Sequence, residues 1–365
     1  PLVARTGDRG AAQALLELWT QLRSGRAREA RTQVFGNGCS KKENTLFVTL
    51  SPSKTGVNFE NKIESSVNLN ILNYIYYYNG AGVASADFNN DGHIDLYFTA
   101  NQSDDKLFLN KGDFQFEDIS KEAGINNSDG WTNGVTIVDI NQDGWMDIYI
   151  CKTGDYLNIK GHNLLYVNQG VSNNGYPTFK EEAKAYGLDF IGFSTQASFF
   201  DFDLDGDLDM YLLNHSTNPN QNYGQGTTRK IANKESGDKL FENKDGIFED
   251  VSEASGIFQS KFSYGLGVSI SDVNNDGFPD IYISNDFFEN DYLYINQGNK
   301  SFKEVIHSEN SPIGHTTHYS MGNDIADINN DGFTDIISVD MLPEDLKTYK
   351  TSGTEFNYQN YSNYI

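Results

Sequence analysis

Hydrophobic and polar residues alternate along most of the chain in short runs of the kind that form β-strands. Residues 94–99 and 281–284 show this pattern. A run of small residues precedes each such segment, and in most units an aromatic, hairpin-like segment follows it. Each unit of about 50 to 70 residues therefore offers roughly four short strands separated by glycine-rich turns. This pattern predicts an all-β fold rather than alternating strands and helices.

The units repeat around a nonapeptide of the form Asp-x-Asn/Asp-x-Asp-Gly-x-x-Asp, which occurs five times. Successive copies start 52, 62, 71 and 55 residues apart, at Asp87, Asp139, Asp201, Asp272 and Asp327. Four-stranded units at this period predict a β-propeller, in which blades stack radially and each buries its face on its neighbours. The small residues before each nonapeptide suit the innermost strand, where the blades crowd the axis.

Each nonapeptide offers the oxygen ligands that calcium prefers. Side chains at positions 1, 3 and 5 can converge on one point, and glycine at position 6 permits a sharp reversal with positive φ. The backbone carbonyl of position 7 and the carboxylate of position 9 complete the shell. We therefore predict up to five Ca²⁺ ions. The predicted ligands are Asp87, Asn89, Asp91, His93, Asp95, Asp139, Asn141, Asp143, Trp145, Asp147, Asp201, Asp203, Asp205, Asp207, Asp209, Asp272, Asn274, Asp276, Phe278, Asp280, Asp327, Asn329, Asp331, Phe333 and Asp335.

Two alternatives to a calcium site between strands fit less well. An EF-hand begins in the same way but needs a glutamate at position 12 and flanking helices. Ordinary Asx turns would account for one loop, but they do not require a carboxylate at position 9 in five copies. Magnesium prefers small octahedral shells rich in water. The residues at position 12 are not acidic: Phe98, Ile150, Leu212, Ile283 and Ser338.

The loops and the glycines before them resemble the FG-GAP/VCBS repeats of integrin-α-type β-propellers. Residues 107–125, with Leu-Phe-Leu-Asn-Lys-Gly, Phe-Glu-Asp-Ile and Ala-Gly-Ile, are similar to bacterial proteins related to cartilage acidic protein, which often end in a UnbV-type domain. The resemblance covers roughly residues 44–346. It implies a seven-bladed, usually extracellular propeller with calcium loops on one face, and side-chain ligands at positions 1, 3, 5 and 9.

The chain holds fewer blades than such a ring. A fifth blade stops after its second strand near Met341, which leaves an incomplete ring of about four and a half blades. Residues 46–63 mimic the outer hairpin of a blade, which in an intact ring would complete the last blade and close the circle. With the rest of the ring missing, we expect a fragment or an open arc. The complete blades are expected at roughly 80–131, 132–192, 193–262 and 263–317.

Composition shifts along the chain predict its domains. Six of the seven arginines lie in the first 31 residues, whereas all lysines lie from Lys41 onward. We therefore predict an atypical arginine-rich extension outside the fold (1–38), a linker or lipoprotein-like tether (39–45), the propeller (46–346) and a truncated C-terminal segment (347–365).

Charge excludes further classes of function. The 365 residues include 27 Lys and Arg against 51 Asp and Glu, and the formal net charge of −24 opposes nucleic-acid binding. Seventeen of these acids lie in the five nonapeptides. No run of eighteen apolar residues exists, so no transmembrane segment is predicted. Cys39 lies in a segment that resembles a lipoprotein cleavage region, without the apolar stretch upstream, and is a candidate lipid anchor. Cys151 is expected to be a small buried hydrophobe.

The leading functional hypothesis is a non-enzymatic adhesion or ligand-binding module, extracellular or at the cell surface, with structural calcium and a protein or glycan ligand. Lipidation of Cys39 would make it an outer-membrane lipoprotein. One alternative is a propeller-based polysaccharide lyase or hydrolase, for which His215, Tyr223 and Arg229 in the long polar loop 214–238 are the clustered candidates. Another is a purely structural module of a larger surface protein.

Two further groups of residues are assigned to structure. His315 and His318 have zinc-like spacing, but no helix or glutamate supports a metalloprotease site, so we expect ordinary hydrogen-bonded histidines. Four tyrosines could form a sugar-stacking platform. Their place before Gly80 favours a half-buried strand that enters the first blade: Tyr74, Tyr76, Tyr77 and Tyr78.

Overall fold

The computed structural model describes residues 47–127, 130–217, 231–287, 289–308, 311–317 and 319–341. These residues form short strands joined by turns, together with two single-turn helices, α2 (Pro52–Thr55) and α3 (Ala183–Tyr186). The strands are β1 (Val83–Ala86), β2 (Asp95–Phe98), β3 (Lys106–Asn110), β4 (Phe116–Asp118), β5 (Trp131–Val138), β6 (Asp147–Thr153), β7 (Leu164–Val171), β8 (Pro177–Glu181), β9 (Ser194–Phe200), β10 (Asp209–Asn214), β11 (Lys239–Lys244), β12 (Ile247–Asp250), β13 (Gly265–Ser271), β14 (Asp280–Asn285), β15 (Tyr292–Asn296), β16 (Phe302–Glu304), β17 (Ser320–Ala326) and β18 (Asp335–Asp340).

The strands are grouped into antiparallel sheets in chain order. Blades one to four are the four-stranded sheets β1–β4, β5–β8, β9–β12 and β13–β16, and blade five is the two-stranded sheet β17–β18. The first strands of successive blades contact one another, from β1 to β5, β9, β13 and β17. This arrangement confirms the predicted all-β propeller of four-stranded blades, and β18 ends beside the predicted stop of the fifth blade.

The hydrophobic core lies between blades rather than inside any one of them. Phe88 and Tyr97 of blade one pack with Ile148 and Phe179 of blade two in one buried cluster. Equivalent clusters join blade two to blade three and blade three to blade four. The second strands of blades two to four, β6, β10 and β14, are buried along their whole length. Each blade therefore depends on its neighbours for most of its apolar burial.

Glycines in the first strands allow the blades to approach one another closely near the axis. A Cβ atom added to Gly134 would lie 2.2 Å from the backbone oxygen of Thr195 in the next blade. One added to Gly267 would lie 2.9 Å from the Cα atom of Gly322. These separations are too short for a side chain, which accounts for the small residues that precede the nonapeptides.

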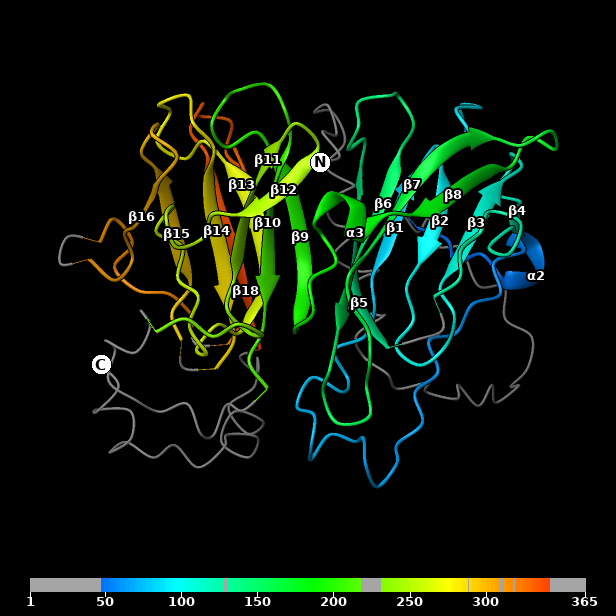
Figure 1. The fold of residues 1–365 in the computed structure, drawn as a ribbon, viewed down its shortest axis with the longest axis horizontal. Coiled ribbons are helices and arrows are strands. Elements are labelled where there is room, and N and C mark those ends of the chain that lie inside the picture. Colours follow the sequence, from blue (N-terminus) through cyan, green and yellow to red (C-terminus); the bar gives the residue numbers. More distant parts are fainter. Residues whose placement is uncertain are drawn as a thin grey trace, which may run out of the picture.

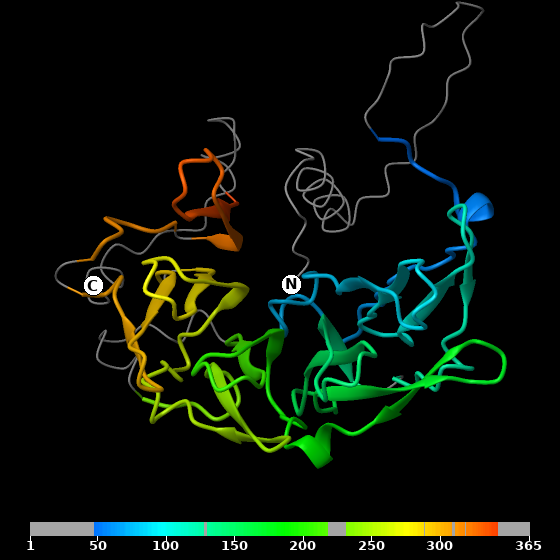
Figure 2. The ribbon, with the colours of Figure 1, turned by 90° about the horizontal axis from the view of Figure 1, so that it is seen from above.

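The blades follow one another around an arc that does not close (Figure 2). The predicted closing hairpin is not formed, because residues 47–63 contain no strand. Instead, this segment packs on the outer part of blade one, where Phe59 stacks on Phe98 with 4.9 Å between ring centroids. A closing strand would have to pair with the last blade of a ring, but blade five lies at the far end of the open arc.

The same N-terminal segment occupies the place of a link between blades. A Cβ added to Gly56, directly after α2, would lie 2.3 Å from the carbonyl oxygen of Phe116. Gly124 and Gly187 meet Phe179 and Phe248 of the following blade in the same way. All three glycines have positive φ, between 77° and 81°. Residues 52–56 thus contact blade one as the end of each blade contacts the next.

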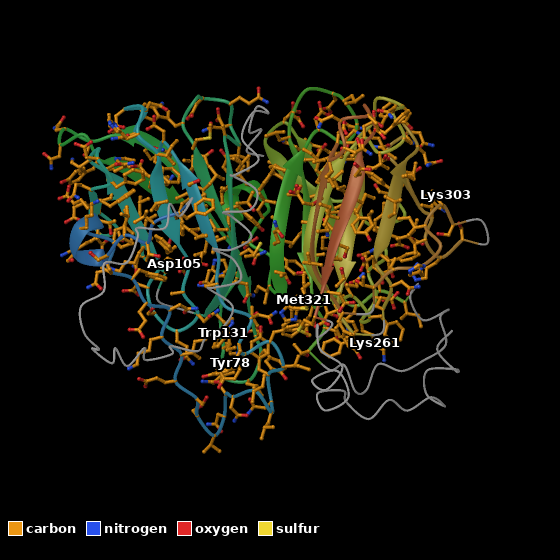
Figure 3. The ribbon with its side chains drawn as sticks, turned by 180° about the vertical axis from the view of Figure 1, so that it is seen from behind. Tyr78, Asp105, Trp131, Lys261, Lys303 and Met321 are labelled. Carbon is orange, nitrogen blue, oxygen red and sulfur yellow. The ribbon has the colours of Figure 1, made fainter. Side chains whose placement is uncertain are left out.

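The tyrosine segment also differs from its prediction, because residues 71–78 form turns rather than a strand. Tyr74, Tyr76 and Tyr77 are nevertheless buried, as the packing interpretation requires, whereas Tyr78 is 60% exposed. Their cluster includes Trp131 at the start of β5 and Met321 of β17. Tyr78 and Trp131 lie at the lower end of the molecule in Figure 3. The segment therefore links several blades at one end of the propeller.

Candidate metal-binding loops

The five nonapeptides form the connections between the first and second strand of each blade. We call them loops one to five: residues 87–95, 139–147, 201–209, 272–280 and 327–335. Because the blades share one strand order and stack side by side, all five loops lie at the same end of the propeller (Figure 1). This end is opposite the starts of the first strands, where Trp131 and Tyr77 pack. The structure therefore gathers the five acidic loops on one face.

Hydrogen bonds from backbone amides shape every loop in the same way. In loop one, Asp87 accepts the N–H groups of Asp91 at 3.0 Å and Gly92 at 2.7 Å. Asp91 in turn accepts the N–H of His93 at 2.8 Å. The corresponding bonds recur in loops two to five at 2.8 to 3.2 Å. The carboxylates at positions 1 and 5 are thus aligned by the loop backbone itself.

Two residues of each loop adopt the left-handed conformation that the tight turn requires. In loop one, φ is 54° at Asn90 and 88° at Gly92. Position 6 is always glycine, which tolerates this conformation without strain. Position 4 carries a side chain in all five loops, with φ between 54° and 62°. The turn predicted from the glycine is therefore present in each copy.

The aspartate at position 9 connects the loop to the rest of its blade. In loop two, Asp147 Oδ2 accepts the N–H of Ile140 at 2.9 Å, and Oδ1 accepts the N–H of Asn168 on β7 at 2.7 Å. Loops one, three and four make the same pair of bonds at 2.8 to 3.1 Å. This carboxylate is buried in loops one to four. The recurrence of this geometry explains why the sequence pattern includes a fourth polar position, at position 9.

Burial and neighbouring carboxylates make position 9 costly to ionise without a cation. Burial raises the pKa to about 6 at Asp95 and Asp147 and to about 7 at Asp209, and the charges of the neighbouring loop aspartates raise it further. Backbone N–H donors oppose this rise. A divalent cation among the carboxylates would favour the ionised form.

The donor set fits a hard cation. In loop three, Asp201, Asp203 and Asp209 each place a carboxylate oxygen within 4.8 Å of the others. The other loops carry asparagine at position 3, whose amide oxygen is also a ligand that calcium accepts. Positions 1, 3, 5 and 9 carry only carboxylate and amide side chains, with no cysteine or histidine, and such oxygen donors suit calcium better than zinc.

Two further sets of polar residues repeat in the blades and were not assigned a role from sequence. The first set lies at the ends of the third strands. In blade two, Asn168 accepts the N–H of Gly170 at 2.9 Å and donates to Phe88 O of loop one at 2.9 Å. In blade four, Asn296 donates to Phe202 O of loop three at 2.8 Å. The sequence signal was the asparagine that ends each third-strand motif: Asn110, Asn168, Asn243 and Asn296.

The second set lies at the opposite end of the blades. In blade three, Asp238 accepts the hydroxyl of Tyr211 at 3.0 Å and the N–H of Asn214 at 2.9 Å. Asp105 and Asp291 make the same bonds in blades one and four. Burial raises the pKa of Asp238 to about 7 and that of Asp105 and Asp291 to about 6. The sequence signal was an Asp or Asn directly before each third strand.

Of the three residues of the enzyme hypothesis, the structure describes only His215. His215 is 2% exposed, and its Nε2 atom lies 3.3 Å from the hydroxyl of Tyr74. Burial lowers the pKa of His215 to about 4. Tyr223 and Arg229 lie outside the described residues. His215 therefore belongs to the packing of the tyrosine segment.

Cysteine and histidine predictions have mixed outcomes. Cys151 is fully buried with a free thiol, as predicted, and burial raises its pKa. Cys39 and His318 fall outside the part of the chain that the structure describes, so the lipid-anchor and histidine-pair hypotheses stay predictions. In the described residues, no helix is long and apolar enough to span a bilayer.

Comparison with known proteins agrees with the repeat pattern. The FG-GAP-like repeat family matches residues 87–150 and 272–338. These two ranges contain loops one, two, four and five in full. The chain contains FG-GAP-like repeats. The chain is 26% identical to cartilage acidic protein 1 of Homo sapiens over 229 residues, and to that of Xenopus tropicalis over 211 residues.

These likenesses are partial. The matches cover 62% and 57% of this chain but only 31% and 29% of the human and frog proteins. Among solved structures, a lectin of Agrocybe aegerita, described as recognising non-reducing terminal N-acetylglucosamine, aligns over 70% of this chain and 73% of its own. Its sequence identity is 17% and the TM-score is 0.30.

Proposed function

We propose that this chain is a calcium-stabilised β-propeller module that binds a protein or glycan partner outside the cell and catalyses no reaction. The observation that carries the proposal is the fivefold recurrence of one loop geometry on one face, with aspartate at position 9 in every copy. The FG-GAP-like repeats support a propeller-type binding module. The extracellular setting follows from the calcium requirement, because free calcium is abundant outside cells.

In each loop, the side chains of positions 1, 3, 5 and 9 and the carbonyl of position 7 would hold the ion. Calcium would supply two positive charges to a cluster of at least three carboxylates. The chain's own contribution is to align these carboxylates through backbone N–H donors and to tie position 9 to the third strand. Binding energy would then add to folding energy, by about 2.7 kcal/mol per site when free calcium is 100 times its Kd.

Calcium titration followed by thermal unfolding tests this proposal. We expect millimolar calcium to raise the Tm by at least about 5 °C over the value in EDTA, with a much smaller rise in magnesium. Isothermal titration should count several sites, and Asp143→Asn should remove one of them. Asp104→Asn, an exposed aspartate outside the loops, serves as the control. Equal melting in calcium and EDTA would contradict the proposal.

A further inference from the structure

Loop three differs from the other loops in charge. Positions 3 and 7 are Asp203 and Asp207, whereas position 3 is asparagine in loops one, two, four and five. Loop three therefore contains five carboxylates where the others contain three. The side chain of Asp203 is only 3% exposed. A buried, additional carboxylate in such a cluster is costly unless a cation compensates for it.

A lysine from the neighbouring blade supplies that cation. Lys300 lies in the turn between β15 and β16 of blade four, and its Nζ atom is 2.5 Å from Asp203 Oδ2. The same Nζ atom is 2.6 Å from Glu242 Oε1 on β11 of blade three. The pairing raises the pKa of Lys300 well above its ordinary value, so the side chain is charged. Lys300 thus joins blade four to the metal-binding loop of blade three.

Loop one shows how the same junction is built when position 3 is uncharged. There, Asn89 Nδ2 donates to Asp91 Oδ2 of its own loop at 2.9 Å and lies 3.5 Å from the carbonyl oxygen of Gly175 in the outer hairpin of blade two. Position 3 therefore faces the hairpin of the following blade in both cases. An asparagine meets a backbone carbonyl, and an aspartate meets a lysine. The asparagines at position 3 donate to the aspartate at position 5 of their own loops, a bond that Asp203 cannot make, and in loop three Lys300 of the following hairpin contacts position 3 instead.

The two oxygens of Asp203 have different surroundings. Oδ2 faces Lys300, whereas Oδ1 accepts the N–H of Asp205 at 3.2 Å inside the loop. Asn296, on the same hairpin as Lys300, also holds the loop by donating to Phe202 O. The hairpin of blade four therefore fixes two consecutive residues of loop three from outside.

From this geometry we propose that Lys300 is a positioning residue that sets the calcium affinity of loop three and couples it to the docking of blade four on blade three. Lys300 pairs with Oδ2 of Asp203, and its positive charge opposes the binding of a calcium ion to the same carboxylate cluster. This inference rests on the proposed calcium function. It adds that the calcium affinity of loop three differs from that of the other loops.

Hydrogen exchange as a function of calcium concentration tests the proposal. Peptides that cover residues 201–209 report loop three, and peptides that cover loops one and two are internal references. In Lys300→Gln, we expect half-protection of loop three at a calcium concentration about three- to tenfold lower than in the unaltered protein, because half of the lysine is exposed to screening solvent. Loops one and two should keep their midpoints.

The metal-free protein gives a second readout. In EDTA, Lys300→Gln should lower the Tm because the carboxylates of Asp203 and Glu242 lose their cation, so the rise in Tm caused by calcium becomes larger. Lys300→Arg should restore both values, and Lys303→Gln on the same hairpin is the matched control. In an Asp203→Asn background, Lys300→Gln should no longer shift the midpoint.

The outcomes separate this inference from the proposed function. Absence of calcium-dependent protection in every loop of the unaltered protein overturns the proposed function. Calcium protection with an unchanged loop-three midpoint in Lys300→Gln overturns only the role of Lys300. A Tm lowered equally with and without calcium also overturns it, because that result describes a purely structural ion pair.

Discussion

At the scale of single residues, buried polar side chains hold strand ends and loops in place through hydrogen bonds that the apolar pattern does not reveal. Both oxygens of Asp147 are used by backbone donors from two different elements. Asp238, at the opposite end of its blade, accepts hydrogen bonds from Tyr211, Ser263 and a backbone amide. Such buried acceptors fix strand ends in place, because a buried amide without a partner is costly. They also make stability depend on pH.

Asp238 should make a measurable part of that pH dependence. Its pKa is raised to about 7 by burial, above about 4 in an unfolded chain, so the folded protein binds the proton more tightly. The resulting contribution to stability is fully present below about pH 4 and is lost as the pH rises through about 7. We expect Asp238→Asn to gain stability relative to the unaltered protein between pH 5 and pH 8, measured by urea unfolding in EDTA.

A natural counterpart and a control support that experiment. Blade two carries Asn163 at the equivalent position, where it accepts the N–H of Lys152 and donates to the hydroxyl of Tyr149. An asparagine therefore fits this site. Asp245→Asn, in an exposed turn, should leave the pH profile unchanged. Parallel profiles for Asp238→Asn and the unaltered protein would show that Asp238 does not titrate as described.

At the scale of elements, the sequence predicted the blades well and the N-terminal segment poorly. Strand runs, turns and loops recur in each unit, so five copies of one pattern support the same prediction of a blade. Residues 47–63 and the tyrosine segment occur once, and their strand-like composition misled the prediction. Both segments pack against blades as single copies, and contacts of that kind leave no periodic signal in the local sequence.

The first strands should be intolerant of added side-chain volume. In Gly134→Ala, the new Cβ would lie 2.2 Å from Thr195 O, and the two first strands would have to move apart. We expect a loss of about 1–3 kcal/mol in the free energy of unfolding. Gly314→Ala places its Cβ where no atom lies within 4 Å and is the control. A Gly134→Ala protein as stable as the control would contradict the close approach of blades two and three.

At the scale of the whole molecule, the propeller is an open arc whose blades are held together in two ways. Apolar clusters fill the spaces between neighbouring blades. The tyrosine segment reaches farther and shares one buried cluster with Trp131 of blade two, Tyr264 next to blade four and Met321 of blade five. It lies at the end opposite the loops, so the predicted calcium sites and the tyrosines secure opposite ends of the blades.

Removing one of these tyrosines should therefore destabilise the whole domain. Tyr77 is fully buried, and its ring centroid lies 5.2 Å from that of Trp131. We expect Tyr77→Ala to cost about 3–5 kcal/mol in chemical unfolding. The neighbouring Tyr78 is 60% exposed, and Tyr78→Ala should change stability by no more than about 0.5 kcal/mol. Similar effects of the two substitutions would refute the linking role of the segment.

The sequence by itself determined the repeat, the strand content and the five acidic loops. The turn of each loop depends on residues within nine positions of one another, whose hydrogen bonds and glycine conformations are set locally. Tertiary structure decided the burial of His215 under Tyr74 and the pairing of Lys300 with Asp203. These partners are separated by roughly 100 residues or more and meet only because blades stack in order. Interactions between residues close in sequence therefore specify each loop and its strands, and the stacking of blades decides which charged residues of neighbouring blades form ion pairs.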